Sequence, residues 1–320
     1  PTNLVGDFGG VLSNNGERLA LALPEDLVTT NTSGGLVTNR VYLVVDEVTY
    51  GEGGRWGRWT DGGGSSLELT DPHADNRLAA NWADSDESRK GAWTTLEHTG
   101  VLDNGNRNIS IDSVAIILQG AGDCLIDEIE VLGPSGNLVA NGGFEGGLNG
   151  WTVRGTHVQS TVQLGEGFSG TRSLRLIATA RGDTGPNQVV TPLTDPLSAG
   201  STATLRLKAR WLRGNSELLL KLHGNFLEAA GAMNLPKDLG TPGAPNSRAV
   251  SNAGPAIFDV AHHPVLPAAN EPFVVTARVH DPDGVASVVL RYRVAPSVSM
   301  VSTNMVDNGT AGDAIAGDGV

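Results

Sequence analysis

Short runs in which apolar and polar residues alternate recur along this chain, and no long stretch spaces its apolar residues as a helix does. In the clearest run, Thr204–Trp211, Leu205, Leu207 and Ala209 alternate with charged residues. Because successive side chains of a strand point to opposite faces, one face of this run belongs to a core and the other to solvent. Further strands are predicted over 41–45, 113–118, 173–178 and 273–279. The pattern predicts an all-β chain built from several β-sandwiches.

Composition narrows the classes of function. A length of 320 residues predicts two or three domains. The net charge of −13 argues against nucleic acid as a partner, because phosphates require clustered cations. The single cysteine, Cys124, excludes a disulfide framework and is predicted to be a buried small hydrophobe. No apolar run reaches the ~18 residues of a membrane span.

The N-terminal part carries an ordered series of motifs that resembles bacterial lamin-tail domains, which have an immunoglobulin-like β-fold. The motifs are GGVLSNNGERL at 9–19, VDEVTY at 45–50, WTDGGGSSLEL at 59–69 and NWADS at 81–85. The string TPGAPNS at 241–247 resembles the closing element of the family but follows only after a long insertion. The resemblance implies a lamin-tail-like domain over 1–86, closed by 234–248, that lacks its opening half and comes from a longer parent protein.

The insertion, residues 87–233, resembles carbohydrate-binding jelly rolls of the galactose-binding-like type. The matching strings are NGGFE at 141–145, GFSGTRSL at 167–174, IIL at 116–118 and LIDEI at 125–129. The strings that close such modules here precede those that open them. We therefore expect a circularly permuted module, with two abutting half-modules as the alternative.

The last segment, 249–320, resembles bacterial immunoglobulin-like or fibronectin-like modules through DPDG at 281–284 and VVLRY at 288–292. We expect this third domain to be truncated.

Calcium is the ion that the acidic residues favour, because it takes six to eight hard oxygen ligands. In modules like the insertion, the positions matching Glu145 and Asp127 bind a structural calcium; the alternative is two exposed carboxylates at strand ends. A second acidic group, Asp307, Asp313 and Asp318, is spaced by small residues that let a loop fold its oxygens inward. Its alternative is a polar hairpin turn.

Cations predict a second kind of site. Arg206, Lys208 and Arg210 share one face of the predicted strand over 204–211, and Arg175 and Lys221 are predicted to join them from neighbouring strands. Such a face on an acidic chain would bind an anionic polysaccharide. The alternative is a solvated face whose cations pair with nearby acids.

The chain contains no GxSxG, HExxH or P-loop motif, and GEGFSG at 165–170 precedes a strand, so it is predicted to be a turn. We expect a non-catalytic extracellular or cell-surface protein that binds a polysaccharide or matrix glycan through the jelly roll, with structural calcium and the neighbouring domains of its parent chain as partners. The alternative is a structural spacer that displays another part of a larger surface protein and has no ligand of its own.

Overall fold

The computed structural model describes residues 9–310 and 312–320, which form two compact units. The sandwich unit comprises Trp59–Ser66 and Asp86–Thr241. The hairpin unit comprises the described residues up to Arg58, Leu67–Ser85 and Pro242–Val320. Residues 1–8 of the predicted lamin-tail-like domain, and residue 311 within the acidic C-terminal string, lie outside the described residues. The all-β prediction is confirmed, since the described residues form strands joined by loops and two short 3-10 segments.

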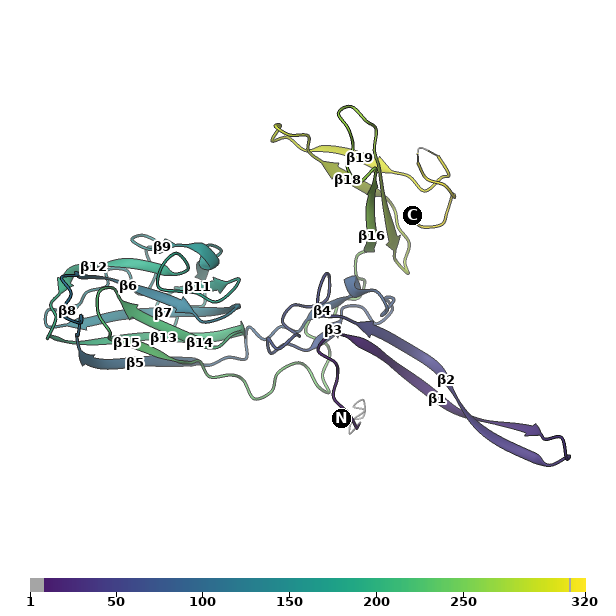
Figure 1. Cartoon of the computed structure of the whole chain (residues 1–320), viewed down its shortest axis with the longest axis horizontal. Coiled ribbons are helices and arrows are strands. Elements are labelled where there is room, and N and C mark those ends of the chain that lie inside the picture. Colours follow the sequence, from purple (N-terminus) through teal and green to yellow (C-terminus); the bar gives the residue numbers. More distant parts are fainter. Residues whose placement is uncertain (1–8, 311) are drawn as a thin grey trace. The chain divides into compact units, whose positions relative to one another are not determined.

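The sandwich unit consists of two antiparallel sheets that face each other (Figure 1). The larger sheet has the order β10-β11-β7-β13-β5, and β8 pairs with β7. Its strands are β10 (Thr161–Leu164), β11 (Arg172–Ala178), β7 (Gly122–Gly133), β13 (Thr202–Gly214), β5 (Trp93–Val101) and β8 (Gly136–Asn137). The smaller sheet has the order β15-β14-β6-β12-β9. Its strands are β15 (Glu228–Ala232), β14 (Glu217–Leu222), β6 (Ile111–Leu118), β12 (Val189–Leu197) and β9 (Thr152–Val153).

The hydrophobic core lies between these two sheets. Leu205, Leu207, Ala209 and Trp211 of β13 are buried, as their alternation with charged residues predicts. The smaller sheet contributes alternate leucines of β14 and apolar side chains of β6, which pair in antiparallel register. Cys124 is also buried in this core, and burial raises the pKa of its thiol well above the ordinary value.

The hairpin unit contains four antiparallel strand pairs. They are β1 (Glu17–Thr30) with β2 (Leu36–Tyr50), β3 (Leu67–Leu69) with β4 (Trp82–Asp84), β16 (Ala256–His263) with β17 (Val274–His280), and β18 (Val288–Tyr292) with β19 (Val301–Met305). The 3-10 segment η1 (Ala79–Asn81) precedes β4, as η2 (Gly155–His157) follows β9 in the sandwich unit.

The string TPGAPNS lies against the β3 segment. The buried carboxylate of Glu68 accepts hydrogen bonds from the backbone N–H and the hydroxyl of Ser247, both at 2.7 Å. The Asn246 side chain donates to the Leu69 carbonyl at 2.9 Å, and the Val250 N–H donates to the Thr70 carbonyl at 2.9 Å. Two segments that are far apart in sequence are thereby joined within the hairpin unit.

Within the described part of the chain, no helix has the length and apolar character needed to cross a membrane.

Candidate functional site

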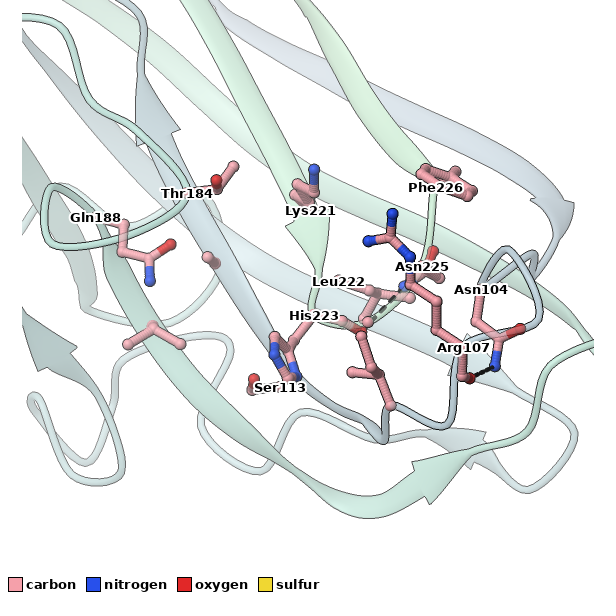
Figure 2. A pocket seen from close by; sticks show the side chains of 14 residues that line it. Asn104, Arg107, Ser113, Thr184, Gln188, Lys221, Leu222, His223, Asn225 and Phe226 are labelled. Carbon is pink, nitrogen blue, oxygen red and sulfur yellow. Dashed lines mark hydrogen bonds between the residues drawn. The ribbon is translucent and has the colours of Figure 1, made fainter.

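A groove of about 310 Å³ is hollowed into the outer face of the smaller sheet of the sandwich unit (Figure 2). Its floor includes Ser113 and Ala115 of β6, Val190 of β12 and Lys221 of β14. These residues alternate with buried neighbours that face the core. Because successive side chains of a strand point to opposite faces, the side chains of these residues point outward. Ser113 and Ala115 are small, which leaves the middle of this face hollow.

One wall of the groove is built from a turn and an aromatic ring. The Asn104 side chain donates to the Arg107 carbonyl at 2.7 Å and closes the turn that carries Arg107. Gly105 has a φ of 63°, and a Cβ there would lie 3.1 Å from Phe226 Cε2. The turn therefore packs closely against the Phe226 ring, which is still 62% exposed.

The opposite wall is the loop before β12. The Asp183 carboxylate accepts hydrogen bonds from the N–H groups of Gly185 and Asn187, and the Asn187 side chain accepts one from the Thr156 N–H. The loop presents Gln188, which lines the groove and is only 9% exposed. The Gln188 side-chain amide makes no hydrogen bond to any described residue, so its donors and acceptor are left for groups in the groove.

A buried histidine supports this wall from below. His157 Nε2 accepts the Leu118 N–H at 3.0 Å, and His157 Nδ1 lies 3.1 Å from the Thr156 hydroxyl. The Leu118 carbonyl in turn accepts the Gly182 N–H at the start of the loop. Burial lowers the pKa of His157 to about 4, so the ring is neutral and carries its proton on Nδ1.

The groove is lined by cations and amides but by no carboxylate of the described residues. Neither Arg107 nor Lys221 forms an ion pair within 4.0 Å among the described residues. His223 lies 3.2 Å from the carboxylate of Asp112, and both side chains are exposed. Figure 2 shows Lys221 between the side of the groove that carries Gln188 and the side that carries Phe226.

The predicted cationic face forms only in part. Arg175, Arg206, Lys208 and Arg210 lie on β11 and β13 of the larger sheet, whereas Lys221 lies on β14 of the smaller sheet. The expectation that Lys221 joins the other four is wrong, because β14 pairs with β6 and β15 rather than with β13.

The cations of the larger sheet have partners of their own. Arg175 contacts the buried Asp123 at 2.7 Å, Arg206 contacts Glu130 at 2.5 Å, and Arg210 forms an ion pair with Glu166. The Lys208 ammonium lies 4.7 Å from the centre of the Phe168 ring and donates to the Thr95 hydroxyl at 2.8 Å. This face is therefore a network of paired charges, and its excess of positive charge is small.

Asp127 and Glu145, the first predicted calcium ligands, hold the same turn over 167–172. Asp127 is buried and accepts the Phe168 N–H at 2.7 Å and the Ser169 N–H at 3.2 Å through one oxygen. Its other oxygen accepts the Glu128 N–H at 2.7 Å. Burial raises the pKa of Asp127, and the hydrogen bonds from the three backbone N–H groups offset this rise only in part.

Glu145 accepts hydrogen bonds from the C-terminal end of that turn. One of its oxygens accepts the N–H groups of Thr171 and Arg172, both at 2.8 Å, and the other accepts the Thr171 hydroxyl at 2.9 Å. The Thr171 N–H, with the other bonds, lowers the pKa of Glu145. One oxygen of each carboxylate thus accepts a single hydrogen bond and retains a lone pair for an ion.

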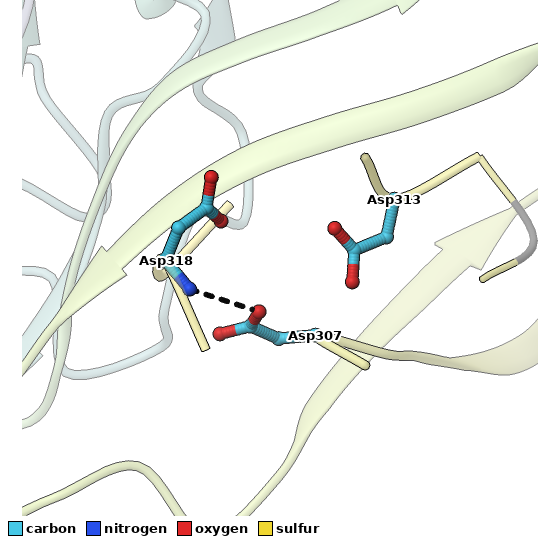
Figure 3. Close-up of side chains that lie close together, drawn as sticks. All are labelled: Asp307, Asp313 and Asp318. Atoms are coloured by element: carbon cyan, nitrogen blue, oxygen red, sulfur yellow. Dashed lines mark hydrogen bonds between the residues drawn. The ribbon is translucent and has the colours of Figure 1, made fainter. Parts of the chain in front are cut away.

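Asp307, Asp313 and Asp318, the second predicted calcium ligands, converge in the hairpin unit (Figure 3). One carboxylate oxygen from each lies within 4.8 Å of the other two. Backbone N–H groups surround them: Gly317, Asp318 and Gly319 donate to Asp307, and Gly309 and Ile315 donate to Asp313. The Gly309 N–H is the main reason that the pKa of Asp313 is lowered.

These three aspartates also line a cavity of about 1040 Å³ between β17 and the β18–β19 pair. Most of its other lining residues are apolar and come from these strands and the loops beside them. The groove of the sandwich unit differs from this cavity because its lining combines one exposed aromatic ring with several polar side chains, as small-molecule and sugar sites do.

The sequence motifs did not point to most of the groove. Asn104, Arg107, Gln188 and Phe226 belong to loops with no motif that distinguishes them, and only the Asn-Gly turn at 104–105 carried a local signal. Comparison with known proteins gives no match: no family model, no curated protein and no solved structure matches the chain.

Proposed function

We propose that the sandwich unit binds a polysaccharide in the groove of its smaller sheet. The observation that carries this proposal is the exposed Phe226 ring opposite Gln188, a residue only 9% exposed that lines the groove and whose side-chain amide makes no hydrogen bond to the described residues. A sugar ring presents an apolar C–H face and a rim of hydroxyls. The first stacks on an aromatic ring, and the second exchanges hydrogen bonds with amides and hydroxyls such as those of Gln188 and Thr184.

Binding without cleavage fits the lining of this groove. Glycoside hydrolysis commonly uses two carboxyl groups on either side of the scissile bond. The described lining contains neither aspartate nor glutamate, and Asp112 at its rim is turned to His223. We therefore propose a binding module rather than a glycosidase.

The wider context of the proposal is an extracellular or cell-surface protein in which a lamin-tail-like domain carries an inserted jelly roll and is followed by an immunoglobulin-like module. The contact of Glu68 with Ser247 supports the view that TPGAPNS closes a domain begun before the insertion. The two facing sheets support the jelly-roll reading of the insertion. Family and location rest on the quoted motifs.

We also propose that calcium stabilises the fold. Asp127 and Glu145 each have one oxygen that accepts a single hydrogen bond, which leaves a lone pair on that oxygen for an ion. Asp307, Asp313 and Asp318 offer three oxygens close together. An ion at either place would be structural, because it lies on the turn at 167–172 or at the C-terminal loop rather than in the groove.

A titration of the full chain with oligosaccharides of neutral and acidic glycans, followed by calorimetry, tests the binding proposal. We expect Phe226→Ala to weaken binding about tenfold or more, as loss of a stacking surface does. Phe168→Ala is the matched control, because Phe168 is also an exposed phenylalanine (44%) of this unit but lies with the larger sheet. Equal losses in the two variants would contradict a site in the groove.

The spacer function is the second candidate, and the paired cations of the larger sheet favour it. A surface whose charges are satisfied internally has little to offer an anionic ligand. If the folded chain binds no glycan of the panel, the binding proposal is wrong and the spacer function is supported.

A further inference from the structure

The ligand class of the groove follows from its two unpartnered cations, and this inference rests on the proposed function. We infer that the groove binds an anionic polysaccharide, whose carboxylate or sulfate groups are held by Arg107 and Lys221. Both residues line the groove, and neither has an acidic partner within 4.0 Å among the residues that the structure describes.

The contrast with the larger sheet gives this observation its weight. On that sheet Arg175, Arg206 and Arg210 each have a carboxylate partner. Such pairing is expected in a chain of net charge −13, because it has more carboxylates than cations. In the groove, by contrast, Arg107 and Lys221 are left for a ligand. Lys221 is also half-buried, so its ammonium group has lost part of its hydration. An anionic group of the ligand would compensate for that loss.

The two cations are placed to act together with the aromatic ring. In Figure 2 the guanidinium of Arg107 lies at the end of the groove that carries Phe226, with the Lys221 ammonium nearby toward its middle. A sugar stacked on Phe226 would direct an acidic substituent toward these cations. The planar guanidinium can hold two oxygens of a carboxylate or sulfate, and the ammonium acts as a point charge.

Carboxylates beside the groove limit the size of the effect, and Asp112 and Glu228 are two that adjoin its lining residues. Asp112 is bonded to His223. Glu228 stands opposite Lys221 in the β14–β15 register, so both side chains project from the same face, but they do not reach the 4.0 Å of an ion pair. Glu228 therefore lowers the local potential and should weaken the binding of an anion.

If the ligand is anionic, removing the cation of this cross-strand pair should weaken binding, and removing the carboxylate should strengthen it. We expect Lys221→Met and Arg107→Met each to weaken binding of an acidic polysaccharide about tenfold or more at low salt. Glu228→Gln should strengthen it several-fold. Lys208→Met is the matched control, because its ammonium lies over Phe168 on the other sheet, and it should leave binding unchanged.

The experiment uses the full chain and pairs of polymers that differ only in charge. Polygalacturonate and alginate are compared with their methyl-esterified forms, and dextran sulfate with dextran, at low and at physiological salt. Preference for the uronates identifies carboxylate as the anion, and preference for dextran sulfate identifies sulfate. Binding should weaken with salt, because exposed charges are screened.

The outcomes separate this inference from the proposed function. Equal binding of charged and neutral members, abolished by Phe226→Ala, would overturn the anionic class and leave glycan binding intact. Binding of an acidic polymer that Glu228→Gln fails to strengthen and Lys221→Met fails to weaken would also overturn it. Absence of binding to all polymers would overturn both.

Discussion

At the scale of single residues, His157 makes the hydrogen bonding behind one wall of the groove dependent on pH. The ring is fully buried and neutral, and its Nε2 is the acceptor for the Leu118 N–H. A protonated ring has a donor at both nitrogens and cannot accept this bond. The Leu118 carbonyl also accepts the Gly182 N–H, at the start of the loop that carries Gln188. The position of that loop therefore depends on whether His157 is protonated.

We expect acid to destabilise the sandwich unit through His157. Its pKa is about 4 in the folded protein, against 6.5 ordinarily. Above pH 6.5 the ring is neutral in both states and stability does not depend on it. As the pH falls from 6.5 to 4, only the unfolded chain takes up the proton, so the free energy of unfolding decreases by about 3 kcal/mol.

Urea denaturation at pH 7.5, 5.5 and 4.5 measures this loss. His157→Gln is the control variant, because its side-chain oxygen can accept the Leu118 N–H without titrating. The variant should lose the part of the pH dependence that lies between 6.5 and 4. A wild-type protein and a variant with the same pH profile would show that His157 does not govern acid stability.

At the scale of elements, the sequence pattern predicts β13 but gives no strand signal for β15 at the edge of the smaller sheet. In β13 a cation follows each of Leu205, Leu207 and Ala209, and this alternation alone predicts which face is buried. The segment 226–233, which contains the edge strand β15, lacks the alternation of apolar and charged residues that marks β13. Alanine and glycine dominate β15 and have no strong strand propensity, so its pairing with β14 decides its conformation.

The β1–β2 ribbon is an element whose stability comes from few buried contacts. The two strands pair from Glu17↔Tyr50 to Thr30↔Leu36, and large apolar side chains such as Leu21, Leu36 and Tyr42 are more than half exposed. A two-stranded ribbon with both faces exposed is marginal in water. Its unpaired edges and exposed side chains make it more accessible to a protease than the buried strands of the sandwich unit.

We therefore expect chymotrypsin at a low ratio to cut the ribbon near Tyr42 before it cuts the sandwich unit. Mass spectrometry of the first fragments locates the cut, and amide exchange of β1 and β2 should be faster than that of β6 and β7. A ribbon protected as strongly as β7 would contradict this prediction. Light scattering would then show whether a second copy of the chain covers it.

At the scale of the whole molecule, the groove is assembled from three segments distant in sequence. They are 104–115, 184–190 and 221–226, and the pairing of β6 with both β12 and β14 brings them together. Local patterns predict strands and the faces that they bury, but they do not tell which strands become neighbours. For this reason the sequence grouped Lys221 with cations of the other sheet and missed Arg107 and Gln188.

The position of the acidic residues was easier to predict than that of the groove residues, because each group lies close to one turn or one loop. The strings at 125–129 and 141–145 placed Asp127 and Glu145 by resemblance, and the turn at 167–172 bonds to both. The short spacing of Asp307, Asp313 and Asp318 allowed one loop to gather them. Sequence alone did not tell how many of their oxygens backbone N–H groups would occupy.

The two compact units allow the two candidate calcium sites to be distinguished in one experiment on the full chain. Multidomain chains commonly unfold in more than one transition. Leu220→Ala removes a fully buried leucine of β14 and should lower the free energy of unfolding of the sandwich unit by about 2–5 kcal/mol. Only the melting transition of that unit should therefore move to lower temperature. That shift identifies which calorimetric transition belongs to which unit.

Calcium should then raise the melting temperature of the unit that binds it. At 100 times its dissociation constant, an ion that binds only the folded state adds about 2.7 kcal/mol, which shifts a transition of this size by several degrees. Binding at Asp127 and Glu145 moves the transition that Leu220→Ala identifies, and Glu145→Gln abolishes the shift. Binding at Asp307, Asp313 and Asp318 moves the other transition, and Asp313→Asn abolishes it. If calcium and a chelator leave both transitions unchanged, the carboxylates act through their backbone N–H partners alone, and the proposal of structural calcium is wrong.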